Sequence, residues 1–444
     1  MGTQPAVSPH DSLRPDAAPS FREMTSVFGA IGLQSFGGPA AQIALMHRVL
    51  VEQRRWLDER AFLSALSFCM LLPGPEAMQL ATYSGWRLHG TRGGLAAGLL
   101  FLAPGAALVL GLSIFYGAYG KTPLVAALFT GVKAAVLAIV LEALVRLGRW
   151  ALRGSIDWFV AAAAFVAIFF FKVPFPLVVI AAAVAGYFRA AAATPAGAAA
   201  HAHAPVPLSQ TLHTLAVWLA VWIVPLAAVV ALFGSDHVLA QLAWFFSKLA
   251  VVTFGGAYAV LAYMAQSVVE RYGWLSPGEM LDGLGLAETT NGPLILVTEF
   301  VGYTAAHRFG GEPPVVMGIL GALVTLWATF APCFLWIFVG APYIERITSA
   351  PRLASALSTV TAAVVGVIGN LSLWFALHVI FHTADERTFG PLRLIVPNLG
   401  SIDLLSVALS LLAVVLLFIV HRGIATTLAI CACASLVWLR FAGA

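Results

Sequence analysis

Charged residues are scarce in this sequence. Only 10% of its 444 residues are Asp, Glu, Lys or Arg, and 60% are hydrophobic, whereas soluble domains carry about 25% charged residues. So little charge excludes an ordinary soluble enzyme or binding domain. The net charge of +4 comes from basic residues scattered through short loops, and without a basic patch we expect no nucleic-acid partner.

Cysteine is also scarce. The four cysteines, Cys69, Cys333, Cys431 and Cys433, all lie inside apolar stretches, which is not the pattern of a disulfide framework. The chain has no His, Cys and Glu cluster at metal-site spacing, no complete phosphate-binding loop and no serine nucleophile elbow. The sequence therefore predicts no metal site, no cofactor and no enzymatic activity.

Long hydrophobic runs are what the sequence has instead. Several reach or exceed the ~20 residues that a helix needs to cross a lipid bilayer. They are apolar on all sides rather than alternating, which excludes the pattern of a transmembrane β-barrel and leaves helices as the spanning elements. The predicted fold is an all-α, polytopic transmembrane protein with about 13 segments. The clearest runs are Gly93–Gly120, Thr211–Ser235, Leu249–Val269, Pro313–Ile344 and Leu353–Ala384.

Changes in composition divide the chain into four parts. Residues 1–20 are polar and Pro-rich without the features of a secretory signal, so we expect a disordered N-terminal tail. The Ala/Pro-rich stretch near residue 200 indicates a flexible connector, which with one linking helix occupies 191–236. The remaining ranges, 21–190 and 237–444, are predicted to be two homologous repeats.

The repeat is visible as three motif pairs that share one offset of 218 residues. Because about seven segments separate one copy from the next, the second half would be inserted upside down if all of them cross the membrane, as in many transporters. Re-entrant hairpins at the motifs are the alternative. The pairs are Phe36-Gly37-Gly38 with Phe254-Gly255-Gly256, Trp56-Leu57 with Trp274-Leu275, and Gly74-Pro75 with Gly292-Pro293.

Two of these motifs interrupt apolar runs with proline. In Leu71–Ala77 and Thr289–Pro293 each helix should break and restart with Pro75 or Pro293 in its first turn. Two half-helix N-termini would then face each other near the middle of the membrane. A helix N-terminus carries about half a positive charge and unpaired N–H groups, so it binds anions. A packing kink is the alternative interpretation of each break.

The candidate substrate-binding residues lie at the breaks or are ionisable residues inside apolar runs. Lys133 and Lys248 could supply charge for a dianion, unless each only pairs with an acid or extends to the interface. Glu76 and Glu288 could carry protons or merely cap helices. The full set is Phe36, Gly37, Gly38, Pro73, Gly74, Pro75, Glu76, Lys133, Lys248, Phe254, Gly255, Gly256, Glu288, Thr289, Thr290, Gly292 and Pro293.

At these motifs the chain resembles the chromate ion transporter family in its long form with two homologous halves. The chain departs from the family pattern at Ser67, Met78, Asn291 and Glu299, all beside the breaks. The resemblance is carried by the motifs 36–41, 55–57, 71–76, 79–83 and 89–94 in the first half and 253–258, 273–276 and 283–290 in the second.

The resemblance implies secondary transport of chromate out of the cell across the bacterial inner membrane, which would confer chromate resistance. Membrane potential or proton exchange would drive it. A sulfate or other small-anion carrier is the alternative within transport, and a membrane scaffold without transport is the alternative from another class. Glycine-rich helix faces would permit a homodimer.

Overall fold

The computed structural model describes residues 19–193, 207–252, 254, 257–344, 350–390 and 392–442. The expected N-terminal tail up to residue 18, the connector between 194 and 206, and the predicted site residues Gly255 and Gly256 lie outside the described residues.

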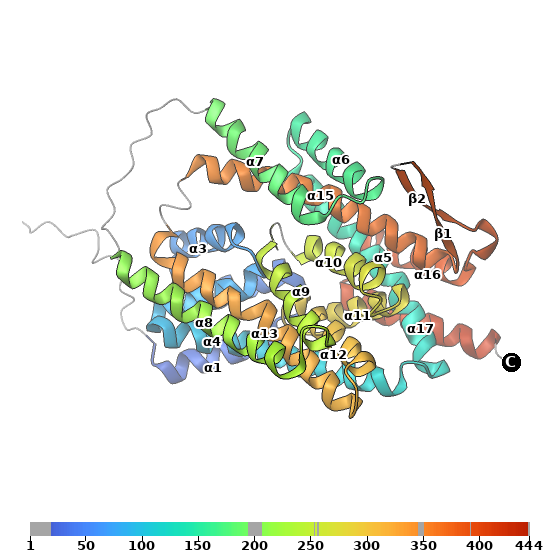
Figure 1. Ribbon diagram of the computed structural model, residues 1–444, viewed down its shortest axis with the longest axis horizontal. Helices are drawn as coiled ribbons and strands as arrows, with labels where there is room; N and C mark the ends of the chain where they lie inside the picture. The colour runs from blue at the N-terminus through green and yellow to red at the C-terminus, as the bar shows by residue number, and fades with distance from the viewer. Residues whose placement is uncertain are drawn as a thin grey trace, which may run out of the picture.

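The fold is helical, as predicted, and Figure 1 shows its arrangement. The elements of the first half are the helices α1 (Phe21–Gln34), α2 (Gly38–His47), η2 (Arg48–Gln53), α3 (Glu59–Leu71), α4 (Glu76–Tyr119), α5 (Pro123–Ala151), α6 (Ser155–Phe169) and α7 (Phe175–Ala193). α4 is kinked at His89 and Gly90, where the backbone leaves the helical region. The linking helix α8 (Leu208–Phe233) follows.

The second half repeats this order of elements. Its helices are α9 (Val238–Val252), α10 (Ala257–Gln266), η3 (Ser267–Arg271), α11 (Pro277–Thr289), η4 (Leu294–Leu296), α12 (Val297–Phe309), α13 (Pro314–Gly340), η5 (Ala341–Tyr343), α15 (Pro351–Ile380), η6 (Leu399–Ser401), α16 (Leu404–Val414), η7 (Val415–Ile419) and α17 (Ile424–Ala442). Here α12 and α13 correspond to the two segments of α4 on either side of its kink.

Capping side chains begin the corresponding helices α3 and α11. The Asp58 carboxylate accepts a 2.7 Å hydrogen bond from the Ala61 N–H at the start of α3. At the start of α11, Ser276 and Glu279 form a reciprocal capping box. Both helices therefore begin at polar residues and run into apolar sequence.

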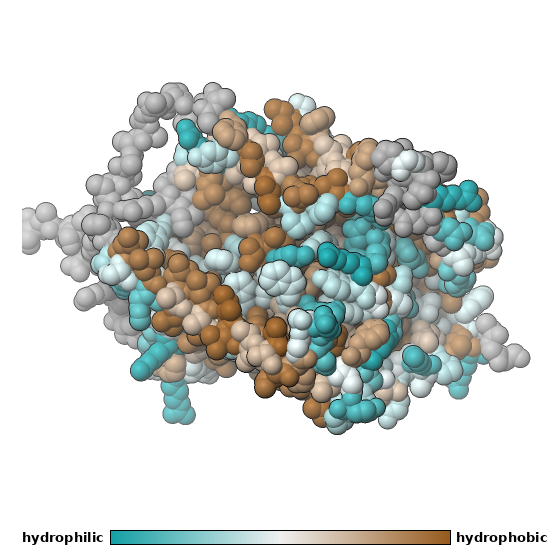
Figure 2. Space-filling view, viewed as in Figure 1, coloured by the Kyte–Doolittle hydropathy of each residue, from teal (hydrophilic) through white to brown (hydrophobic). Residues whose placement is uncertain are grey.

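Six helices in the described part of the chain are long and apolar enough to cross a membrane. Shorter apolar helices accompany them, and Figure 2 shows hydrophobic residues spread over the outer faces of α6 and α7 and of α8 and α13. These features confirm the predicted polytopic membrane protein. The six helices are Glu76–Tyr119, Pro123–Ala151, Leu208–Phe233, Pro314–Tyr343, Pro351–Ile380 and Ile424–Phe441.

The two halves have opposite orientations along the second segment of α4, which is about 43 Å long at 1.5 Å per residue. At the start of this segment, the His89 ring is hydrogen-bonded to the Pro19 carbonyl, two residues before α1, and Glu23 of α1 pairs with Arg54 just before α3. At its other end Tyr116 donates a 2.7 Å hydrogen bond to Asp282, near the start of α11. Corresponding helices α3 and α11 thus begin at opposite ends of α4, as an inverted repeat requires.

The halves also exchange packing partners. α5 of the first half packs against α16 and α17 of the second, and α15 of the second half packs against α6 and α7 of the first. Figure 1 shows α15 beside α7 and α6 on one side of the molecule. Helices of each half therefore pack against helices of the other, and the hydrophobic core is continuous between the halves.

A β-hairpin is the one kind of element that the sequence analysis did not foresee. Strands β1 (Ala384–Phe389) and β2 (Leu392–Pro397) pair antiparallel between α15 and α16. They lie at the edge of the helical body in Figure 1. The hairpin is a local addition and does not contribute to the breaks.

Candidate functional site

Both predicted helix breaks are present. α3 ends at Leu71 and α4 begins at Glu76, and α11 ends at Thr289 before η4 begins at Leu294. Between them Gly74 (φ +122°) and Gly292 (φ +91°) adopt backbone conformations that L side chains rarely occupy.

The two prolines differ in position from the prediction. Pro75 and Pro293 were expected in the first helical turn, but each precedes its helix with an extended backbone (ψ 111° and 137°). An extended proline cannot be part of the turn, so each helix starts one residue later. In the second half the 3₁₀ turn η4 then separates the break from α12.

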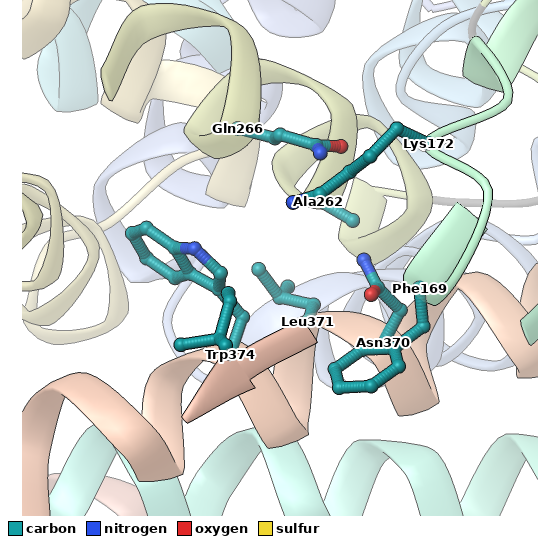
Figure 3. Close-up of a pocket in the computed structure, with 8 residues that line it drawn as sticks. Phe169, Lys172, Ala262, Gln266, Asn370, Leu371 and Trp374 are labelled. Carbon is teal, nitrogen blue, oxygen red and sulfur yellow. The ribbon is translucent and has the colours of Figure 1, made fainter. Parts of the chain in front are cut away.

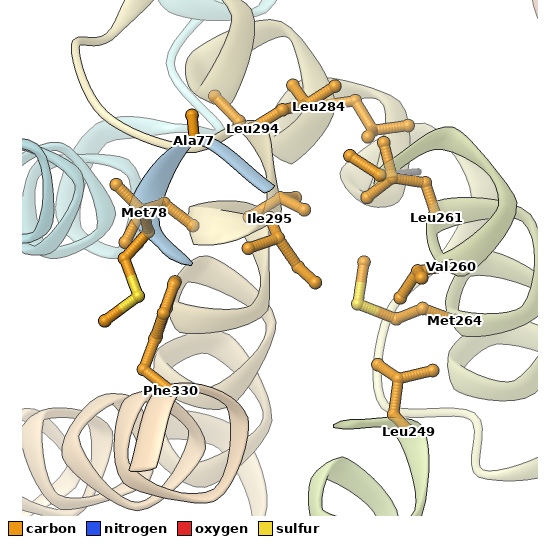
Figure 4. Packing of buried hydrophobic residues seen from close by; sticks show 14 of the residues in the cluster. Ala77, Met78, Leu249, Val260, Leu261, Met264, Leu284, Leu294, Ile295 and Phe330 are labelled. Carbon is orange, nitrogen blue, oxygen red and sulfur yellow. The ribbon is translucent and has the colours of Figure 1, made fainter. Parts of the chain in front are cut away.

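The restarted helices lie side by side. α4 packs against η4 and α12, and Figure 4 shows Ala77 and Met78, at the start of α4, next to Leu294 and Ile295. No side chain caps the start of α4 or of η4. The first N–H groups of a helix have no acceptor within it, so two helix N-termini with their positive dipole ends converge in the buried core.

The second break is held by hydrogen bonds from the first half. Gln42 of α2 donates from Nε2 to the carbonyls of Gly292 (2.6 Å) and Ser35 (3.2 Å). The Gly292 N–H donates to the Ser35 carbonyl at 2.9 Å, and Asn291 Nδ2 donates to the Gly32 carbonyl at 3.2 Å. We call Ser35–Gly38, Pro73–Pro75 and Thr290–Pro293 together the break cluster.

The first break, at Pro73–Pro75, is also held by a hydrogen bond and by close packing. Gln79 donates from Nε2 to the Pro73 carbonyl at 2.7 Å. A Cβ atom on Gly74 would lie 2.8 Å from Gln79 Nε2 and 2.9 Å from Cys333 Sγ. These distances leave no room for a side chain at position 74.

The predicted residues of the α1–α2 connection belong to the break cluster. Gly37 (φ +87°) and Gly38 (φ +78°) turn the chain into α2, while the Phe36 side chain is 52% exposed. Phe254 occupies the corresponding place after α9 and is half-buried. Its neighbours Gly255 and Gly256 lie outside the described residues.

Several buried polar atoms near the start of the restarted helices have no hydrogen-bond partner among the described residues. Gln42 Oε1 and Gln79 Oε1 belong to the side chains that hold the breaks. Thr298 Oγ1 and Glu299 Oε2 belong to the first turn of α12, where Glu299 is only 1% exposed. Buried polar atoms are normally satisfied. Three of these four are acceptor oxygens, so a donor such as water would complete their hydrogen bonding.

The acidic and hydroxyl candidates at the breaks have different surroundings. Glu288 is buried and accepts a 2.9 Å hydrogen bond from the Tyr258 hydroxyl of α10. Glu76 is half-buried at the start of α4. Thr290 is buried and donates to the Ala287 carbonyl, whereas Thr289 is exposed and donates to Leu286. Both threonine hydroxyls thus close the last turn of α11.

Lys133 lies in an ion pair at the opposite end of α11 from the break. Its Nζ is 3.3 Å from Asp282 Oδ1, and the Tyr116 hydroxyl donates to Asp282 Oδ2 at 2.7 Å. Asp282 is eight residues before Thr290, about 12 Å along a helix. Lys133 was predicted from the sequence, with pairing to an acid as the alternative, whereas Asp282 and Tyr116 were not predicted. The acid inside the apolar run of α11 was the available signal.

Lys248 is half-buried in α9. Its Nζ lies 5.8 Å from the centroid of the Tyr263 ring of α10, a distance at which a cation is attracted to the ring face. Within the described residues it has no carboxylate at ion-pair distance. It is therefore a cation that no acid neutralises on the helix leading to Phe254.

A second polar cluster joins the halves away from the breaks. Lys172, in the α6–α7 connection, lies 3.4 Å from Glu270 of η3, and Trp374 Nε1 donates to the same carboxylate at 3.2 Å. Figure 3 shows Lys172, Gln266 and Trp374 around a hollow whose volume is about 10 Å³. That volume holds about one water molecule, so this cluster is an inter-half contact and not a substrate site.

The sequence model described as chromate transporter matches residues 22–187 and 240–438, which are the two halves of the fold. The chain belongs to the chromate transporter family. It is 33% identical over 363 residues to the chromate transport protein of Pseudomonas aeruginosa, covering 80% of each chain. It is 29% identical over 354 residues to a probable chromate transport protein of Synechococcus elongatus, covering 79% of this chain and 83% of that one. No solved structure matches this member of the family.

Proposed function

We propose that this protein exports chromate across the bacterial inner membrane and that the anion binds in the break cluster. The observation that carries the proposal is the convergence of two uncapped helix N-termini, at Glu76 and at Leu294, in the buried core. Oriented N–H groups and dipoles bind an oxyanion without a full positive charge in the membrane. Chromate is such an oxyanion, and it is the transported ion in the names of the relatives.

The remaining candidates act around this site. Pro73, Gly74, Pro75, Thr290, Gly292 and Pro293 shape the two breaks, and Phe36–Gly38 and Phe254 border them. Lys248 adds positive charge on α9, the helix that leads to Phe254. Lys133 is released from Asp282 to meet the anion when the helices move. If transport is coupled to protons, Glu76 and Glu288 bind and release those protons.

The membrane potential suffices as a driving force. Moving two negative charges outward through ~100 mV releases about 4.6 kcal/mol. That free energy sustains a gradient of more than about a thousandfold. The inverted halves would expose the site alternately to the two sides of the membrane.

A sulfate carrier is the second candidate, because sulfate has the same charge and tetrahedral shape. The open oxygen atoms of Gln42, Gln79 and Glu299 favour neither anion. Cells that lack other chromate transporters and express this protein should accumulate less radiolabelled chromate than cells expressing Gly74→Ala at the same level. Equal chromate in both strains, with a difference in radiolabelled sulfate, would favour the sulfate carrier.

A further inference from the structure

A hollow lies on one face of α3. It is shallow and open to the outside, with about 470 Å³ of space bordered by residues of α3 alone: Glu59, Arg60, Leu63, Ser64 and Ser67. These positions recur every three to four residues and so form a single stripe along the helix. The Ser64 and Ser67 side chains are exposed on it. Two exposed hydroxyls and an arginine on a helix of a membrane protein indicate a water-filled space rather than lipid.

The charges at the mouth of this hollow suit an anion. The Glu59 carboxylate is hydrogen-bonded to His47, whose Nε2 lies 2.8 Å from it. Arg60 is exposed and has no ion pair within the described residues. The Arg60 guanidinium offers charged hydrogen-bond donors of the kind that hold an oxyanion. Ser64 adds an exposed hydroxyl farther along the same face, while the Ser67 hydroxyl donates to the Leu63 carbonyl at 2.8 Å.

In the second half the same stripe is covered. The offset of 218 residues maps the five lining residues of α3 onto α11, and α5 residues contact three of them. A Cβ atom on Gly278 would lie 3.2 Å from the Lys133 ammonium, which pairs with Asp282. Val132 occupies the space next to Gly285. The corresponding residues are Pro277, Gly278, Leu281, Asp282 and Gly285.

Two corresponding leucines on α3 and α11 differ in exposure. Leu63 is 49% exposed on α3, whereas its counterpart Leu281 is 0% exposed on α11. The helix that corresponds to α5 is α15, and it packs against α5, α6, α7 and α10. Within the described residues α3 packs mainly against α4, and α15 does not cover it. The corresponding faces of α3 and α11 are therefore exposed in the first half and covered in the second.

We propose that the hollow on α3 is the open entrance for a small oxyanion in this conformation, and that the α5–α11 contact is its closed counterpart at the opposite end of the molecule. The identity of the anion rests on the proposed function; the pairing of entrances does not. In the opposite conformation α15 covers Ser64 and Ser67, and α5 leaves α11. That movement separates Lys133 from Asp282 and frees the lysine for the anion.

The ion pair has no counterpart in the first half. Ser64 occupies the position of Asp282, and Thr361 and Ala362 straddle the position of Lys133. Closing α15 on α3 therefore forms no equivalent bond. The Lys133–Asp282 pair, supported by Tyr116, thus favours the conformation in which α3 is open.

Matched cysteine variants test this inference. Leu63→Cys and Leu281→Cys are the same substitution at corresponding positions, and each is made in Cys433→Ala, because Cys433 is the exposed native cysteine of the described chain. A charged, water-soluble thiol reagent is applied to both sides of membranes containing each variant. Leu63→Cys should react at least about tenfold faster than Leu281→Cys, and adding Asp282→Asn should slow the first reaction and speed the second.

The direction of the change separates the outcomes. Opposite changes at the two positions support paired entrances, even if the protein moves no chromate, in which case only the proposed function fails. Equal reactivity of the two cysteines, or no response to Asp282→Asn, would overturn the inference in a protein that still transports chromate. Faster reaction at both positions would indicate unfolding, and it would also contradict a two-state exchange.

Discussion

Gln42 of the first half donates a 2.6 Å hydrogen bond to the Gly292 carbonyl of the second half. The same amide group bonds to Ser35, so one buried side chain connects the α1–α2 turn with the break that precedes η4. The position of one helix N-terminus is thereby set by the other half of the molecule. Rearrangement of the halves must act directly on this contact.

Gln42→Ala should therefore destabilise the break cluster. The buried Gly292 carbonyl loses its donor, and an unsatisfied group costs about 1–3 kcal/mol. The Ser35 carbonyl loses one of two donors and keeps the Gly292 N–H. We expect a lower melting temperature in detergent and a loss of most chromate transport. The matched control is Gln34→Ala, because Gln34 is exposed eight residues earlier. If the two variants behave alike, Gln42 does not hold the break.

Gly74→Ala, in the break before α4, should be more harmful than a glycine substitution within α4. The methyl group would meet Gln79 and Cys333 below 3.0 Å, and the backbone strain at φ +122° adds about 1–3 kcal/mol. Gly111→Ala is the control, since a Cβ there meets nothing within 4 Å; it should be neutral or stabilise α4 by up to about 1 kcal/mol. Thermal unfolding and chromate uptake measure both effects, and full activity in Gly74→Ala would contradict the role of this break.

Lys133→Ala should abolish chromate transport and also lower stability. Breaking a fully buried ion pair costs about 3–5 kcal/mol, and the 28% exposure of the Lys133 side chain places this pair below that range. The double variant Lys133→Ala with Asp282→Ala should recover stability because no unpaired carboxylate remains, yet it should stay inactive. Recovered transport in the double variant would show that Lys133 has only a structural role.

Lys248→Gln should weaken the apparent affinity for chromate while the protein stays folded. Lys248 has no acidic partner among the described residues, so its removal leaves no buried anion, and only the contact with Tyr263 is lost, about 0.5–2 kcal/mol. Lys248→Arg keeps the charge and should retain most of the affinity. The Michaelis constant for uptake distinguishes these variants, and equal constants in Lys248→Gln and the unaltered protein would exclude an electrostatic role.

Much of this architecture could be predicted from sequence because the bilayer restricts the choices. Long apolar runs with few charges must form helices, and the Gly-Pro pairs at a constant offset of 218 residues indicated interruptions at corresponding places. Pro75 and Pro293 therefore located both breaks to within one or two residues. The inverted order of the halves was predicted from the number of segments between the two copies, on the condition that all of them cross the membrane.

Contacts between distant segments could not be predicted in this way. Gln42 and Gly292 are 250 residues apart, and no local pattern shows that α2 of one half reaches the break of the other. The partners of Lys133 depend likewise on how α4, α5 and α11 meet. The β-hairpin at Ala384–Pro397 was missed because its short strands lie between two strong helical patterns.

Chromate uptake into inside-out membrane vesicles tests the central claim most directly. The account predicts uptake that increases when the vesicle interior is made positive, that sulfate inhibits, and that is lost in Gly74→Ala but kept in Gly111→Ala. If vesicles with verified, folded protein take up no chromate above protein-free vesicles under an imposed potential, the assignment of chromate as the exported anion is contradicted.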